Sequence, residues 1–218
     1  MNVDGMMLPP ILSIDRTAAA VEALRRYFAH EGEVPAYSGS RFERFAGGGD
    51  RAEVADHFTS EDLVAVTLLS VDIPGPAALR LLGDQEPGYS RRLSDLLSQL
   101  PTDVALVDAS DDHLSIAEEI WSMVRDNRRV GRTKTSKLLA RKRPHLLPVI
   151  DSVVIKTVGH VPARHSFYRN LRTVMNADGR QLVTHLEHVR TSAEIGEDIS
   201  TIRVFDILVW MWGTGRIQ

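Results

Sequence analysis

Apolar residues recur at helical spacing along most of the chain. In residues 15–30 they fall largely on one face, which predicts an amphipathic helix with Asp15 as its N-cap. No two segments combine strand-like alternation with a tight hairpin turn. The pattern therefore predicts an all-α fold. Further helices are expected over residues 59–71, 76–82, 90–100, 114–125, 166–175, 181–189 and 200–212.

Polar residues mark the starts of several of these helices. Thr59 and Asp62 have the spacing of a capping box ahead of an apolar run, and Ser200 precedes the last predicted helix. The chain has no internal repeat and no linker that divides it sharply. We therefore expect a single helical domain over residues 1–218.

One long segment, residues 31–50, interrupts the helical pattern. It is rich in glycine and proline and contains the run Gly47-Gly48-Gly49. It also carries Tyr37, Phe42 and Phe45, aromatic residues that a simple linker would not need. Long loops in compact domains are often functional, so the segment is a candidate part of a binding site.

Composition removes several classes of protein. The 218 residues carry a formal charge of −3 and include no cysteine. Without cysteine the chain cannot hold disulfides, thiolate nucleophiles, Cys-type structural zinc or Cys-ligated iron–sulfur clusters. No signal-peptide pattern and no apolar run long enough to cross a bilayer is present, which predicts a cytoplasmic protein that does not contact membranes.

The near-neutral total hides an uneven distribution of charge. Residues 125–143 hold nine basic residues and one acidic residue, a net charge of +8, which leaves 17 basic and 28 acidic residues, or −11, elsewhere. A charge run is usually a solvated helix face. Here it surrounds a turn at Gly131, and phosphate binding needs backbone N–H groups at a helix start beside cations. The basic strip therefore predicts a polyanionic partner.

A longer motif includes this turn. Residues 129–139 follow one predicted helix and open another, Pro144 and the segment 147–154 come next, and Asp151 lies 20 positions after Gly131. Over residues 127–154 this arrangement resembles the helix-hairpin-helix (HhH-GPD) superfamily of DNA glycosylases. The resemblance implies a two-lobed helical fold with a long N-terminal loop. The helix-hairpin-helix would occupy about residues 115–142, and the catalytic aspartate segment residues 147–154.

The motif departs from the family pattern at three positions. Asn127-Arg128-Arg129 replaces the usual Leu-Pro-Gly, so Asn127 or a basic residue is expected to adopt a positive φ at some strain. Val153 stands where the family usually has histidine. Thr133 stands where members that also cut the DNA backbone have lysine, which implies a monofunctional, purely hydrolytic enzyme.

The resemblance also implies which residues act. The partner would be double-stranded DNA with a damaged or modified base, bound by a cytoplasmic, nucleoid-associated monomer without cofactor or metal. Asp151 would be the catalytic residue, stabilising positive charge on the sugar and positioning water. Asp is also the commonest type of helix N-cap, so Asp151 has a purely structural alternative. The expected DNA-contacting residues are Arg128, Arg129, Val130, Gly131, Arg132, Thr133, Lys134, Thr135 and Lys137.

A glycosylase must flip its target base into a pocket, commonly lined by aromatic side chains. The candidates are Tyr37, Arg41, Phe42, Trp121 and Trp210, although a core or loop-anchoring role is an alternative for each aromatic residue. The substrate base stays open, and so do DNA repair and attack on modified phage DNA. The unusual loop at residues 37–50 motivates the defence hypothesis. Two other functions remain: a non-catalytic DNA-binding module, and a helical domain that binds an acidic protein.

His185 and His188 are three positions apart and could share a helix face. Two histidines at this spacing are a partial metal-ligand pattern, but no third ligand accompanies them. We therefore expect a solvated helix face at this place and no metal site.

Overall fold

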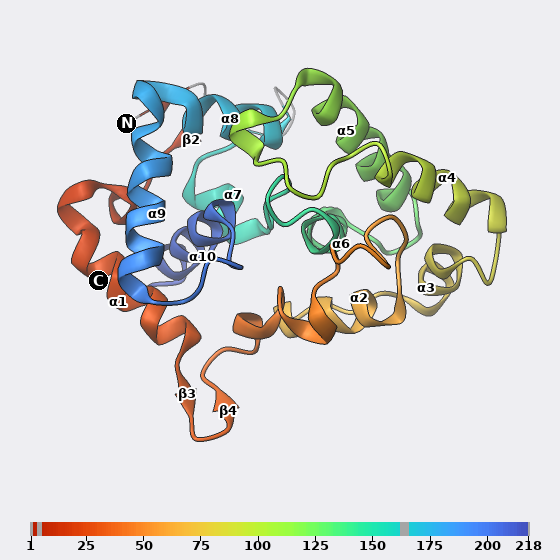
Figure 1. Ribbon diagram of the computed structural model, residues 1–218, viewed down its shortest axis with the longest axis horizontal. Coiled ribbons are helices and arrows are strands. Elements are labelled where there is room, and N and C mark those ends of the chain that lie inside the picture. Colours follow the sequence, from red (N-terminus) through yellow and green to blue (C-terminus); the bar gives the residue numbers. More distant parts are fainter. Residues whose placement is uncertain (1, 4–5, 162–165, 218) are drawn as a thin grey trace. The chain divides into compact units, whose positions relative to one another are not determined.

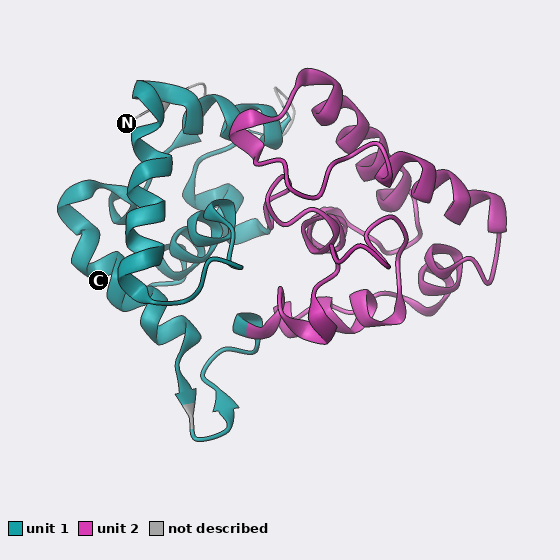
Figure 2. Ribbon diagram, viewed as in Figure 1, with its two compact units in different colours: residues 1–40, 150–218 teal, residues 41–149 magenta. Residues whose placement is uncertain are grey.

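The computed structural model describes residues 2–3, 6–161 and 166–217, and almost all of its regular structure is helical (Figure 1). The chain forms two compact units (Figure 2). Unit 1 combines both ends of the chain, residues 1–40 and 150–218, and unit 2 is the uninterrupted segment 41–149. The all-α prediction is confirmed. Within the described part, no helix is both long and apolar enough to span a membrane.

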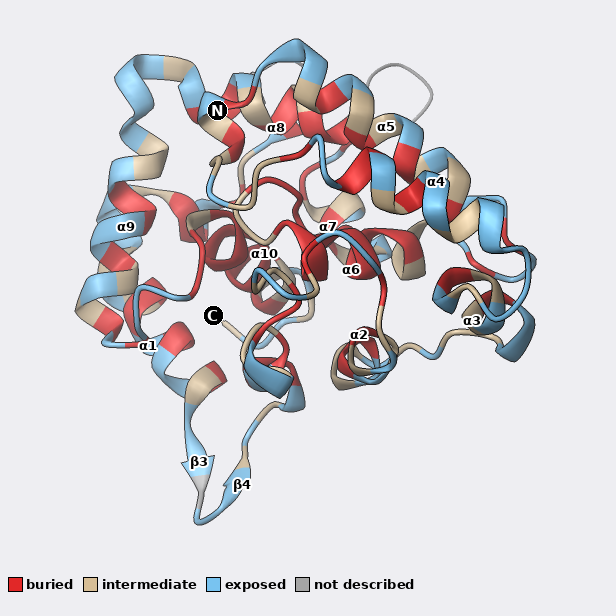
Figure 3. Cartoon of the chain, turned by 45° about the vertical axis from the view of Figure 1, so that its right-hand side comes forward, coloured by how far each residue is buried: buried red, intermediate tan, exposed pale blue. Residues whose placement is uncertain are grey.

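Unit 1 is built around its last helix, α10. Every residue of α10 from Ile202 to Val209 is buried, because this segment is apolar on nearly all sides and packs against α1, α7 and α9 (Figures 1 and 3). The helices of this unit are α1 (Thr17–Phe28), α7 (Ser152–Thr157), α8 (Phe167–Asn176), α9 (Gln181–Ala193) and α10 (Thr201–Gly213), with 3₁₀ turns η1 (Pro10–Leu12), η2 (Ile14–Arg16) and η7 (Ala177–Arg180).

Unit 2 surrounds helix α6, whose residues 135–142 are all buried (Figure 3). Its other helices form the rest of this unit's core. They are α2 (Ser60–Ala65), α3 (Gly75–Leu82), α4 (Pro87–Leu97) and α5 (Asp111–Arg125), while α6 itself spans Arg132–Lys142. The 3₁₀ turns of this unit are η4 (Phe45–Gly47), η5 (Val66–Leu69) and η6 (Leu106–Asp108); a further turn, η3 (Ser38–Arg41), lies where the two units join in sequence.

Two very short antiparallel strand pairs are present beside the helices. Strand β1 (Asn2–Val3) pairs with β2 (Met6–Met7), and β3 (His30–Glu31) pairs with β4 (Val34–Pro35). Gly32 has a φ of 67° in the second turn. Strands of two residues are too short to produce a readable alternation, which is why the sequence pattern does not reveal them.

Two of the three predicted helix caps are confirmed and one is wrong. Asp62 and Thr59 form the expected capping box, and the Ser200 hydroxyl accepts the N–H of Arg203 at 3.2 Å. The prediction for Asp15 is wrong, because a 3₁₀ turn containing Asp15 precedes α1. Arg16 is the N-cap residue of α1, and among the described residues no side chain accepts a capping hydrogen bond there. The extra turn moves the helix start two residues beyond the expected one.

Candidate nucleic-acid interface and catalytic aspartate

A tight turn joins α5 to α6 in unit 2. Gly131 precedes α6 in an extended conformation, with φ −88° and ψ −179°. Arg129 adopts a φ of 65°, the left-handed region that glycine enters most readily. The prediction that Asn127 or a basic residue takes the positive-φ position is thus confirmed, and that residue is Arg129.

Asn127 holds this turn in place, a role that the sequence did not suggest. The side chain is 5% exposed, and its Nδ2 donates to the Tyr89 hydroxyl at 2.7 Å and to the Val124 carbonyl at 2.9 Å. Arg80 donates to Oδ1 of Asn127 at 3.3 Å. Burial raises the pKa of Tyr89, so its hydroxyl stays protonated and donates to the Met123 carbonyl at 2.8 Å. The hydrogen bonds of the buried Asn127 side chain therefore hold the turn in place.

The start of α6 has unused backbone donors. The N–H groups of Gly131, Arg132, Thr133 and Lys134 donate to no residue in the described part of the chain, and no described side chain caps the helix. Thr135 makes the first helical bond, to the Gly131 carbonyl at 3.1 Å. Gly131 is exposed, and a Cβ built on it would meet no described atom within 4 Å. Neither its backbone angles nor its surroundings within the chain demand glycine.

Five cations of the basic strip accompany this helix start. Arg125, Arg128 and Arg129 are exposed, while Arg132 and Lys134 are half-buried. Lys134 lies 3.8 Å from the exposed carboxylate of Asp72, a weak surface ion pair. The three arginines before the turn are thus accessible, and they precede the unused donors closely in sequence.

The downstream half of the strip is buried, which corrects the expected DNA-contacting set. Thr135 and Lys137 are 0% and 6% exposed, and Val130, just before the turn, is 3% exposed. Lys137 donates from Nζ to the Leu69 carbonyl at 2.7 Å inside unit 2. None of these three side chains is available to a phosphate. Arg141, Lys142 and Arg143 are also buried, so a count of charges along the sequence overstates the basic surface.

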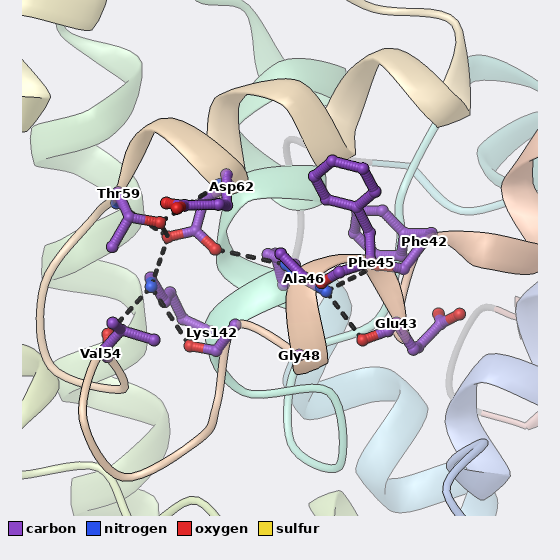
Figure 4. Close-up of polar contacts among 12 residues, drawn as sticks. Phe42, Glu43, Phe45, Ala46, Gly48, Val54, Thr59, Asp62 and Lys142 are labelled. Atoms are coloured by element: carbon purple, nitrogen blue, oxygen red, sulfur yellow. Dashed lines mark hydrogen bonds and ion pairs between the residues drawn. The ribbon is translucent and has the colours of Figure 1, made fainter.

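The buried cations hold the glycine-rich segment that follows η3. Arg141 donates to the Phe42 and Glu43 carbonyls at 2.7 Å each, and Lys142 donates to the carbonyls of Gly49 at 3.2 Å and Val54 at 3.0 Å. Figure 4 shows these carbonyls converging on the two side chains. The segment is therefore anchored in the core of unit 2 rather than free to act as a loose loop.

Asp62 is the buried counter-charge for this cluster. Its Oδ1 lies 3.3 Å from Nε of Arg141, and its Oδ2 pairs with Nζ of Lys142 (Figure 4). A Cβ on Gly49 would lie 2.5 Å from the Arg141 carbonyl and 2.7 Å from Asp62, so glycine is required there. Burial lowers the pKa of both Arg141 and Lys142, and the charge of Asp62 opposes that shift.

Arg143 closes the other side of the cluster. It donates to the Leu100 carbonyl at 2.6 Å, to the Ala55 carbonyl at 2.8 Å and to the half-exposed carboxylate of Asp56 at 2.7 Å. Burial lowers its pKa, while Asp56 acts in the opposite direction. Every partner named here belongs to unit 2, so the role of this arginine is structural.

Asp151 is the N-cap of α7 in unit 1. Its Oδ1 accepts the N–H groups of Val153 and Val154, both at 2.9 Å. Oδ2 accepts no hydrogen bond from any described residue, and the side chain is half-buried. The structural role expected as an alternative is therefore present, and one carboxylate oxygen remains available for other chemistry.

The proposed base-pocket residues are divided between the two units. Tyr37 stacks on Tyr27 at 5.0 Å and meets Trp210 edge-on at 6.1 Å in unit 1, with the Arg216 guanidinium 4.6 Å from the Trp210 ring. Arg41, Phe42 and Trp121 belong to unit 2. Phe42 is 1% exposed beneath the glycine-rich segment and is a core residue, which corrects its assignment to a pocket. Arg41 is exposed and Trp121 half-buried.

The family model described as "Family of unknown function (DUF6308)" matches residues 20–213. The chain belongs to this family. No curated protein and no solved structure matches the chain significantly. In this DUF6308 chain the matched span includes the hairpin, the buried cations and Asp151.

The histidine pair differs from expectation in this DUF6308 chain. His188 is exposed as predicted, but His185 is buried, at 7% exposed, and its Nε2 has no hydrogen-bond partner in the described part of the structure. Burial lowers the pKa of His185. Within the described residues, no cluster of three or more His, Asp or Glu side chains could hold a metal ion.

Proposed function

We propose that this DUF6308 chain is a monofunctional DNA glycosylase that binds double-stranded DNA through the α5–α6 hairpin. The observation that carries the proposal is the start of α6, where unused backbone donors directly follow the exposed Arg128 and Arg129 in sequence. Such a helix start attracts phosphate because its N–H groups and the helix dipole both favour an anion. Arg128, Arg129 and Arg132 add charge without reading the base sequence.

Gly131 gives independent support for close contact with a ligand. A glycine is needed where φ is positive, where packing leaves no room for a Cβ, or where another molecule approaches the backbone. The first two reasons do not apply, because φ is −88° and a Cβ on this residue would have no described atom within 4 Å. Glycine also suits the N-cap position that Gly131 occupies, and its bare backbone leaves room for a phosphate to approach.

Asp151 supplies the chemistry in this proposal. Its Oδ2 stabilises the positive charge that develops on the sugar and accepts a proton from the attacking water. The water oxygen bonds to C1′ as the C1′–N bond breaks, and the base leaves with the bonding electrons and takes up the proton. Thr133 in place of a lysine removes the amine that would form a covalent adduct with the sugar.

Binding is tested with Gly131→Ala, measured by fluorescence anisotropy on duplex DNA over a series of salt concentrations. We expect the variant to lose about 1 kcal/mol of unfolding free energy at most, because alanine is a poorer N-cap than glycine, and to bind DNA at least fivefold more weakly. Lys137→Gln is the matched control, since Lys137 bonds to a carbonyl inside unit 2 and should leave the salt dependence of binding unchanged. Equal affinity of Gly131→Ala and wild type would count against phosphate contact at the hairpin.

Catalysis is tested by incubating the protein with DNA that carries varied modified bases, including modified phage genomes, followed by alkali to cut at abasic sites. Asp151→Asn should abolish base release and keep DNA binding, because asparagine caps helices as well as aspartate does. Release from damaged genomic bases would indicate repair, and release from phage bases would indicate defence. If no base is released from any of these DNAs, the proposed glycosylase activity is refuted.

The second candidate is a non-catalytic DNA-binding module. The observation that favours it is the double capping bond of Asp151 Oδ1, which gives this residue a structural reason to be present. Under this alternative the hairpin still binds DNA, Gly131→Ala still weakens binding, and no base is released. The alkali assay therefore separates the two functions.

A further inference from the structure

Unit 1 contains a pocket of about 720 Å³ that has no part in the proposed DNA site. One wall is the chain from Leu8 through η1 and η2, and the other is the corner where α8 passes through η7 into α9. Figure 1 shows α8 and α9 meeting at this corner. The volume is in the range of pockets that bind small organic molecules.

The walls of the pocket are mostly apolar, and its charged groups are of one sign. Leu8, Leu12, Val174 and Leu182 supply hydrocarbon surface. Asp15 and Asp178 contribute two exposed carboxylates, and no lysine or arginine is among the residues that line the pocket. Hydrogen bonding from Ser13 lowers the pKa of Asp15, which keeps that carboxylate ionised.

A buried histidine without a partner distinguishes this pocket from an ordinary surface hollow. His185 lines it, is 7% exposed, and leaves Nε2 without a hydrogen bond to any described residue. Buried polar atoms in proteins are nearly always satisfied, so an orphaned ring nitrogen indicates a missing partner. Packing within the folded chain gives no reason for histidine at position 185, because an apolar side chain would fill the same buried place on α9.

We propose that this pocket binds a small organic cation, a protonated amine carried on an apolar or aromatic body. The body contacts the leucine and valine side chains, because transfer from water to an apolar wall is favourable. The ammonium group lies towards Asp15 and Asp178, whose charges attract it and repel an anion of the same shape. His185 forms a hydrogen bond with the bound molecule. This inference is independent of the glycosylase proposal.

The test uses three probes with one indole body: tryptamine, tryptophol and indole-3-propionate, which carry a positive, a neutral and a negative group. Each is titrated into the full-length protein without DNA, and methyl NMR shifts of Leu12, Val174 and Leu182 report binding. We expect tryptamine to bind at least tenfold more tightly than indole-3-propionate, with tryptophol between them. Equal affinities, a reversed order, or shifts away from these methyl groups would overturn the proposal.

Variants separate charge from shape. The double variant Asp15→Asn/Asp178→Asn should weaken tryptamine binding at least fivefold and remove the preference for the amine; asparagine tolerates the φ of 49° at Asp178. Glu187→Gln removes one exposed charge from α9 outside the pocket and should change nothing. Leu182→Trp should fill the pocket and abolish binding of all three probes.

His185→Phe tests the histidine. The ring shape is kept and both nitrogens are lost, so tryptamine affinity should fall at least threefold while the thermal midpoint is unchanged or higher. Unchanged affinity in this variant would overturn the role of His185, and unchanged affinity in the double aspartate variant would overturn the choice of a cation.

Discussion

Lys142 forms an ion pair with Asp62 in the interior of unit 2, where the two side chains are 0% and 1% exposed. Asp62 is shared with Arg141, which lies 3.3 Å from its other oxygen. Two buried cations therefore depend on one carboxylate and on the backbone carbonyls of the segment 42–54. These residues of the basic run therefore stabilise the interior of unit 2 and are not part of its basic surface.

We expect Asp62→Asn to lower the free energy of unfolding by about 3–5 kcal/mol, because removing one partner of a buried ion pair leaves uncompensated charge. The asparagine side chain keeps the size of the residue, so the loss reports charge rather than a cavity. Urea denaturation of the full chain measures it.

The control for this change is Asp72→Asn, which removes the exposed partner of Lys134. A surface ion pair contributes little, and the control should stay within about 0.5 kcal/mol of the wild type. Similar losses in the two variants would mean that the carbonyls alone balance the buried cations.

Arg129 offers a second prediction that separates stability from binding. Its φ of 65° costs an ordinary residue roughly 1 kcal/mol relative to glycine, so Arg129→Gly should raise the free energy of unfolding by about that amount. The same change removes one exposed cation and should lower DNA affinity, with a salt slope smaller by about 0.9.

Arg128→Gly is the matched control, because Arg128 is also exposed and is not among the residues with positive φ. It should weaken DNA binding in the same way but gain no stability. If both variants gain stability equally, the backbone strain at Arg129 is not what the substitution relieves.

Local sequence signals predicted most of the helices and their starts. Thr59, Asp62 and Ser200 act within a few residues of the helix ends that they cap. The missing glycine of the hairpin predicted a positive φ at Asn127 or a basic residue, and Arg129 adopts it. Such features depend on near neighbours in the chain, which is why pattern alone reveals them.

Burial of charge could not be predicted in this way. Arg141 meets Phe42 across 99 positions of sequence and Asp62 across 79, and only the packed fold brings them together. Two weak signals existed: the aspartate Asp62 in the first turn of an apolar helix, and glycine at Gly49 where a backbone approaches closely.

Gly213 on α10 provides a prediction that concerns the aspartate indirectly. A Cβ there would lie 2.1 Å from Oγ1 of Thr157 and 2.7 Å from Cγ1 of Val153, so α7 could not keep its place. We expect Gly213→Ala to cost about 1–3 kcal/mol of stability, the usual range for overpacking a core. Because Asp151 caps α7, base release should fall with it.

Gly75→Ala is the control for that substitution, since a Cβ at Gly75 would meet no described atom within 4 Å and its φ is not positive. Its free energy of unfolding should change by no more than about 0.5 kcal/mol. Urea denaturation compares the two variants. A loss in Gly75→Ala as large as that in Gly213→Ala would argue against crowding as the cause.

His185 makes the stability of the chain depend on pH in a definite direction. Burial lowers its pKa below the ordinary value of about 6.5, and the neighbouring His188 adds to the shift. At a pH between the lowered pKa of the folded state and the ordinary pKa of the unfolded state, His185 binds a proton in the unfolded chain but not in the folded chain. The stability is therefore complete above about pH 6.5 and is lost as pH falls towards the lower, folded-state pKa.

His185→Phe should flatten this part of the pH profile, measured as the free energy of unfolding in urea from about pH 7.5 to about pH 5. His188→Phe removes the smaller cause of the shift and an exposed ring, so most of the slope should remain. Parallel profiles for wild type and His185→Phe would show that other groups carry the acid sensitivity. A steeper fall in His185→Phe would reverse the sign worked out from burial.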